Sequence, residues 1–142
     1  MSFERGPYLS VAAFCENVIE DKTGVLSLIR IVDKVVITGK GTQVPEDMPP
    51  GEIVWNLVLV LKGGDVRGSH PLRVQPVLPS GENVNPMTIT VHLDGANRGP
   101  NVVIPMRLPV KMPGIYWTKI YFNDELMTQL PIEVVYSRIQ AS

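Results

Sequence analysis

Apolar and polar residues alternate strictly along the second half of the chain, and this pattern constrains the fold most. Apolar residues stand at every second position in residues 72–78, 87–94 and 102–110. A period of two is typical of a β-strand with one buried face. Pro105 and Pro109 interrupt the third segment, and proline cannot donate a hydrogen bond to a neighbouring strand. We therefore expect three strands here, the third at the edge of its sheet or broken.

The C-terminal quarter predicts a β-hairpin. Residues 115–122 and 125–136 both have strand character, and only Asn123 and Asp124 separate them. Asn and Asp tolerate the positive φ angles that a tight two-residue turn requires.

The first half predicts three further strands, over residues 8–19, 25–38 and 53–62, with a turn at Asp21 to Gly24 between the first two. A helix is the competing interpretation of residues 25–38, because their apolar residues also match helical spacing. The many β-branched residues in this segment favour a strand instead.

Eight short strands with no clear helix predict a single all-β domain over residues 1–142, an antiparallel β-sandwich of immunoglobulin-like or C2-like type. The sequence Pro113-Gly114-Ile115-Tyr116 resembles the tyrosine corner of immunoglobulin-like domains. The single cysteine excludes the paired cysteines of antibody domains. Residues 44–51 hold three prolines and are expected to form a long loop or a mobile arm.

Composition limits the partners. The net charge of -1 gives no general attraction for nucleic acid or anionic lipid, so we expect neither as a partner. No apolar run approaches the roughly 20 residues that span a bilayer, and the N-terminus lacks the apolar stretch of a signal peptide. We expect a cytoplasmic protein.

The sequence offers little for catalysis. Gly39-Lys40-Gly41 is followed by Val44 and Pro45, which break a dinucleotide-binding pattern. Ser69-His70 reads as a polar turn because no G-x-S-x-G motif accompanies it. Cys15 has no cationic neighbour in its strand and is interpreted as a small buried residue. We therefore predict a protein that is not an enzyme and needs no cofactor.

Acidic loops supply one alternative function. If every connection reverses direction, four aspartates share one end of the sandwich, and carboxylates from several loops can bind calcium, as in C2-like domains. These are Asp21, Asp65, Asp94 and Asp124. Four basic residues fall at the same end and oppose a divalent cation: Lys22, Lys62, Arg67 and Arg98.

The main functional signal is that residues 53–61 are apolar on both faces, interrupted only by Asn56. One face fills the core, so the other requires a cover, and large exposed apolar patches commonly mark partner surfaces. We predict that this sheet forms a homodimer or binds another protein through Leu28, Arg30, Val32, Val54, Val58 and Val60. The alternative is that residues 44–51, or the tail from Ser137, cover this face.

Two groups of segments together resemble an uncharacterised bacterial family, a domain of unknown function. The first group is residues 14–19 with 26–33, and the second is residues 113–116 with 123–126 and 130–132. The resemblance implies a cytoplasmic bacterial β-sandwich and assigns no catalytic residue. Together with the apolar sheet, it predicts a non-enzymatic interaction or structural module that self-associates.

Overall fold

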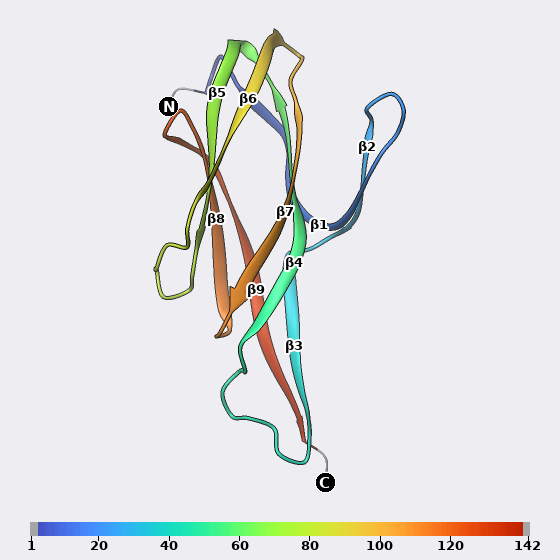
Figure 1. Ribbon diagram of the computed structural model, residues 1–142, viewed down its shortest axis with the longest axis vertical. Helices are drawn as coiled ribbons and strands as arrows, with labels where there is room; N and C mark the ends of the chain where they lie inside the picture. The colour runs from blue at the N-terminus through green and yellow to red at the C-terminus, as the bar shows by residue number, and fades with distance from the viewer. Residues whose placement is uncertain (1–2, 141–142) are drawn as a thin grey trace.

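The computed structural model describes residues 3–140, and within them nine strands form two sheets that face each other (Figure 1). The strands are β1 (Tyr8–Glu20), β2 (Leu26–Ile31), β3 (Lys34–Gly41), β4 (Gly51–Lys62), β5 (Gly64–Val77), β6 (Met87–Ala96), β7 (Asn101–Val110), β8 (Gly114–Phe122) and β9 (Glu125–Gln140). The first sheet has the order β2-β1-β4-β7 and the second β3-β9-β8-β5-β6. The predicted β-sandwich is confirmed. All neighbouring strands are antiparallel except β3 and β9.

Alternate residues of the two sheets meet in one apolar core, as the period of two predicts. From β4, the inward side chains are Ile53, Trp55, Leu57, Leu59 and Leu61. From β7, they are Val102, Ile104, Met106, Leu108 and Val110. The ring centroids of Phe14 and Trp55 lie 5.1 Å apart within this core. β7 is an edge strand, as its two prolines predict. Among residues 3–140 no helix is long and apolar enough to cross a membrane.

The C-terminal hairpin and the tyrosine corner are confirmed. Asn123 and Asp124 have φ angles of 48° and 63°, and the turn joins β8 to β9 with Phe122 opposite Glu125. The buried Tyr116 hydroxyl donates a hydrogen bond to the main-chain oxygen of Met112 over 2.6 Å. This bond fixes the start of β8 to the segment before it, as in immunoglobulin-like domains.

Residues 25–38 form two strands, so the prediction of one strand is wrong, and so is the helical alternative. β2 belongs to the first sheet and β3 to the second, with the crossing at Val32 and Asp33. The amide of Val32 donates to the Phe14 oxygen over 2.8 Å, and the amide of Glu133 donates to the Asp33 oxygen over 3.0 Å. Hydrogen bonds to both sheets thus divide the segment at Val32 and Asp33. The structure therefore has nine strands where the sequence predicted eight.

Ser69 and His70 lie inside β5, so the predicted polar turn is also wrong. β5 begins at Gly64 and pairs with β6, with Ser69 opposite His92 and His70 opposite Val91. Two polar residues before Pro71 suggested a turn, but pairing with β6 keeps the segment extended.

The proline-rich loop at residues 44–51 is held against β9. Val44 and Met48 are buried, and Met48 belongs to the core. The Tyr136 hydroxyl donates to the Pro45 oxygen over 2.8 Å. Residues 137–140 of the tail continue β9 and pair with β3 in the second sheet, and residues 141 and 142 lie outside the described part of the chain. The loop and the described part of the tail therefore do not cover the outer face of the first sheet, which was the alternative that the sequence left open.

Candidate functional site

The outer face of the first sheet contains a second buried patch. Val58 and Cys15 point away from the core between the sheets, yet both are 0% exposed. Val58 lies between Ala13 of β1 and Val103 of β7, and Cys15 lies opposite Asn56. Burial also raises the pKa of the Cys15 thiol. The prediction that Cys15 is a small buried residue is confirmed, and the prediction that this face needs a cover is consistent with its burial.

A hairpin of the chain itself provides this cover. β1 pairs with β4 only as far as Cys15, and from Glu16 onward it pairs only with β2. We call residues 16–31 the β1–β2 hairpin; Figure 1 shows it standing beside the first sheet, on the side away from the second. At its base, the Asn56 side chain donates to the Glu16 oxygen over 3.0 Å. At its tip, the Asn101 side chain donates to the Gly24 oxygen over 3.1 Å.

The hydrogen bond of Asn56 explains why a polar residue interrupts an otherwise apolar strand. Asn56 is the polar residue that interrupts the apolar strand 53–61, and it binds the main chain where β1 leaves the sheet. Asn101 stands on β7, at the opposite edge of the sheet from β2. The sequence shows that Asn56 is unusual, but no sequence pattern links Asn101 to Gly24, which is 77 residues away.

The residues predicted to form an interface differ in accessibility. Arg30 and Val54 are exposed; Leu28, Val32 and Val60 are half-buried; Val58 is fully buried. Val32 packs against the core between the sheets. A partner could therefore reach Arg30 and Val54 directly, while Val58 lies beneath the surface of the single chain.

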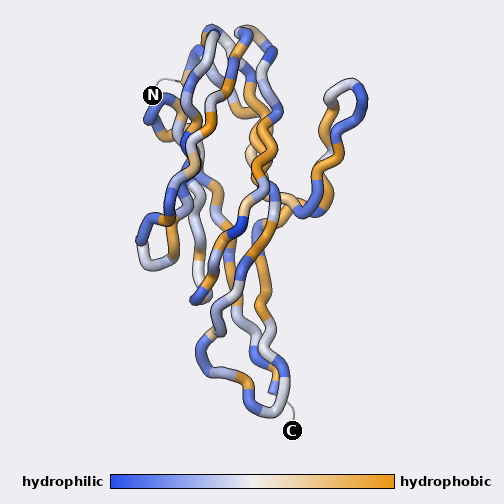
Figure 2. The backbone as a smooth tube through the Cα atoms, in the orientation of Figure 1, coloured by the Kyte–Doolittle hydropathy of each residue, from blue (hydrophilic) through white to orange (hydrophobic). Residues whose placement is uncertain are grey.

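Two exposed isoleucines lie on one face of the β1–β2 hairpin, and a third stands at its base. Ile29 pairs with Asn17 and Ile19 with Ser27, so Ile19 and Ile29 share a face. Ile31 is opposite Cys15 and follows Arg30, whose φ angle of 57° interrupts the regular alternation of the strand. Ile19, Ile29 and Ile31 are 54%, 40% and 67% exposed. Figure 2 shows hydrophobic residues continuing from the first sheet into this hairpin, whose tip is hydrophilic. Leu28, one of the contact residues predicted from the sequence, lies on the opposite face of the hairpin.

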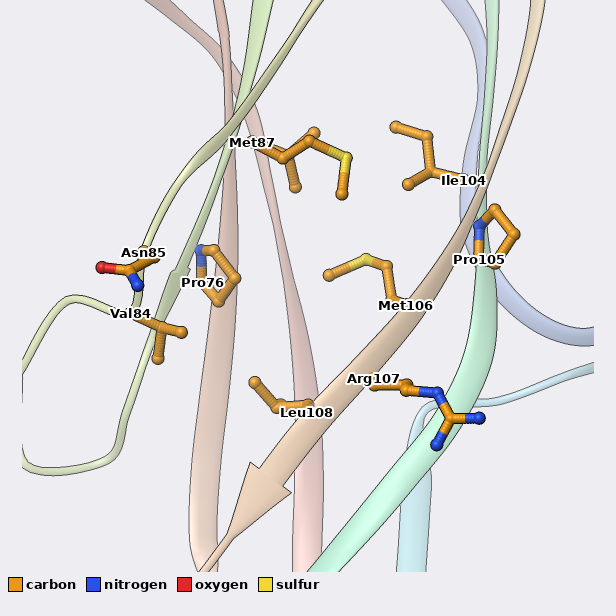
Figure 3. A pocket seen from close by; sticks show the side chains of 10 residues that line it. Pro76, Val84, Asn85, Met87, Ile104, Pro105, Met106, Arg107 and Leu108 are labelled. Carbon is orange, nitrogen blue, oxygen red and sulfur yellow. The ribbon is translucent and has the colours of Figure 1, made fainter.

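A cavity opens between the sheets where β7 passes the segment before β6 (Figure 3). Its volume is about 120 Å³, and Met87 and Met106 point into it from opposite sides. The lining is mainly apolar. The Arg107 guanidinium at its margin lies 2.7 Å from the Glu52 carboxylate on the outer face. The cavity therefore contains no set of converging acid, base and nucleophile.

A second cavity of about 290 Å³ adjoins the first and shares Val84 with it. Pro79, Pro109 and Met112 give it apolar walls, and Lys111 adds a positive charge. Tyr116 also lines it, and its hydroxyl donates a hydrogen bond to the Met112 oxygen. The two cavities together form an apolar opening at one side of the sandwich.

One polar cluster has the composition of a hydrolase triad. Ser69 Oγ lies 3.3 Å from His92 Nδ1, and His92 Nε2 lies 3.3 Å from an Asp94 carboxylate oxygen. All three side chains are exposed on strands β5 and β6. None of them lines a cavity described above, so no enclosed site positions a substrate or an oxyanion beside the serine. We interpret the cluster as a cross-strand row of polar contacts.

The four aspartates of the calcium alternative are not brought together. Asp21 accepts hydrogen bonds within its own turn, which lower its pKa, chiefly from the Thr23 hydroxyl and the Val25 amide. Asp94 contacts His92, and Asp124 lies 3.6 Å from Arg73. Across residues 3–140, no three His, Cys, Asp or Glu side chains are placed to hold a metal ion.

Comparison with known proteins identifies a family but no activity. No curated protein matches the sequence. A solved structure of an immunoglobulin-like protein from Pseudomonas aeruginosa is similar, with 15% identity and a TM-score of 0.41, and covers 85% of this chain and 90% of that one. At this TM-score the likeness carries no argument about function. The model of the family of unknown function DUF6941 matches residues 10–135. This match includes all or part of each of the nine strands, and the chain belongs to the family of unknown function DUF6941.

Proposed function

We propose that this protein is a non-enzymatic interaction module that self-associates through the first sheet and the β1–β2 hairpin. The observation that carries the proposal is the exposed set of Ile19, Ile29, Ile31 and Val54, gathered on these two neighbouring elements. Apolar residues gathered in this way commonly mark a protein partner, whereas single exposed ones are normal.

Charge and cavities support the same proposal. The net charge of -1 favours a protein partner over nucleic acid or an anionic membrane surface. The two cavities are mainly apolar, and the triad-like cluster is exposed on the surface of a sheet. Neither feature has the enclosed, converging polar groups that catalysis requires.

Thermal unfolding at several protein concentrations tests self-association. Association of folded chains stabilises them by mass action, so the melting temperature rises with concentration. We expect such a rise. A melting temperature that is the same over a wide concentration range would contradict the proposal.

A further inference from the structure

We propose that two copies of this chain meet across a two-fold axis through the exposed face of the β1–β2 hairpin, with Ile19 and Ile29 at the centre of the contact. This inference rests on the proposed function, because it specifies the partner and the contact surface of the same module.

One face of the hairpin has no cover within the chain. Beyond Cys15 the hairpin consists of two strands that pair only with each other, so its stability depends on packing against further structure. One face is partly covered, since Val18, Leu26 and Leu28 are half-buried. The other face presents Ile19 and Ile29 to solvent, and Ile31 is exposed at its base. A partner that covers this second face would complete the burial of the hairpin.

The accessible surface area of the chain is larger than that of a typical monomer of its mass. Folded monomers of 15.7 kDa expose about 7,300 Å² by the usual scaling with mass. This chain exposes 8617 Å², an excess of about 1,300 Å². A stable interface of standard size buries about 800 Å² on each partner. The excess therefore accommodates one interface of standard size.

Charge favours a second copy over a strongly charged partner. On the hairpin, Arg30 Nε lies 2.9 Å from a Glu16 carboxylate oxygen. On the same sheet, Arg107 lies 2.7 Å from Glu52. Each pair is neutral in sum, and the remaining charged residues of the hairpin, Glu20, Asp21 and Lys22, give it a net charge of only -1. A two-fold contact places the same patch on both partners, so a hairpin with nearly balanced charges meets its copy with little repulsion.

The other large exposed apolar residues are dispersed. They stand on four different strands and one loop, outside the first sheet's outer face and the hairpin: Val36, Met87, Met112, Ile115, Leu126 and Ile139. Single exposed apolar residues are normal on soluble proteins. The hairpin face thus differs from the remaining surface in the clustering of its apolar side chains.

Self-crosslinking of a single introduced cysteine tests the two-fold contact. Ser27 is exposed and shares the face of Ile19 and Ile29, so Ser27→Cys places a thiol near its own copy across the axis. The native Cys15 is 0% exposed and should not react. We expect mild oxidation to give a covalent dimer from Ser27→Cys. The control Thr90→Cys, exposed on β6 of the other sheet, should give none.

A second variant addresses the contact without crosslinking. Ile29→Asp places a charge at the proposed centre and should weaken association about tenfold or more, whereas Ile139→Asp at the end of β9 should leave association unchanged. If chains associate but Ser27→Cys does not crosslink and Ile29→Asp has no effect, this inference is wrong and the proposed function stands. If wild-type chains do not associate at any concentration, both are wrong.

Discussion

The side chain of Asn101 on β7 donates a hydrogen bond to the main-chain oxygen of Gly24, at the tip of the β1–β2 hairpin, over 3.1 Å. Replacing this asparagine with alanine should release the tip from the sheet. Because a single hydrogen bond contributes about 0.5–1.5 kcal/mol, we expect amide exchange at Asp21 and Gly24 to accelerate by up to about tenfold. Asn97→Ala, on the connection before β7, is the matched control and should leave the exchange unchanged.

If the hairpin amides exchange at the wild-type rate in Asn101→Ala, the hairpin is held by other contacts. The same measurement on Asn56→Ala examines its base, where the Asn56 side chain donates to the Glu16 oxygen over 3.0 Å.

The turn of this hairpin should be sensitive to acid. Hydrogen bonds from the Thr23 hydroxyl and the Val25 amide lower the pKa of Asp21 from 3.8. A carboxylate whose folded pKa is depressed contributes stability above its unfolded pKa and loses it as the pH falls through its folded pKa. We therefore expect Asp21→Ala to speed exchange in the hairpin at neutral pH and to match the wild type well below pH 3.8.

Asp21→Asn provides the matched control, because its side-chain oxygen still accepts hydrogen bonds but does not titrate. Its hairpin exchange, corrected for intrinsic rates, should not show the acid transition. An equal effect of Asp21→Ala at all pH values would contradict a contribution from the charged carboxylate.

Val58 and Val54 point to the same face of β4 and differ in burial. Val58 is 0% exposed and Val54 is 58% exposed. Truncating the buried residue leaves a cavity, so Val58→Ala should lower the free energy of unfolding by about 1–3 kcal/mol. Val54→Ala should change it by less than about 0.5 kcal/mol. Urea denaturation measures both values, and equal effects would show that the hairpin does not shield Val58 in solution.

The tyrosine corner should contribute measurably to stability. Tyr116→Phe removes the hydroxyl that donates to the Met112 oxygen over 2.6 Å at a buried position. The expected loss is about 1–3 kcal/mol in the free energy of unfolding. Tyr121→Phe is the control, since this ring lies on the outer face of β8 and keeps its contact with the Arg73 guanidinium. A loss no larger than that of the control would contradict the role of the corner.

Local patterns predicted the parts of the fold in which neighbours in sequence are neighbours in space. The turn at Asn123 and Asp124 and the corner at Tyr116 depend on residues two to four positions apart, and both are confirmed. The break at Val32 and Asp33 depends instead on bonds to Phe14 and Glu133. No glycine or proline marks that break, so the run of β-branched residues was interpreted as one strand.

The same distinction applies to the candidate site. Two apolar faces in residues 53–61 showed that the outer face needs a cover, and the full burial of Val58 agrees with this expectation. The identity of the cover depends on the bend after Cys15 and on the bond between Asn101 and Gly24, which join distant parts of the chain. For this reason the sequence favoured Leu28 and Val58 as contact residues, whereas the structure exposes Ile29 and Ile31.

The central claim is that this chain associates with a second copy of itself, and sedimentation equilibrium measures this most directly. For the wild-type protein the account predicts a particle mass of twice 15.7 kDa at high concentration, falling towards 15.7 kDa on dilution. A mass of 15.7 kDa at every concentration would contradict self-association and leave the hairpin face exposed in solution.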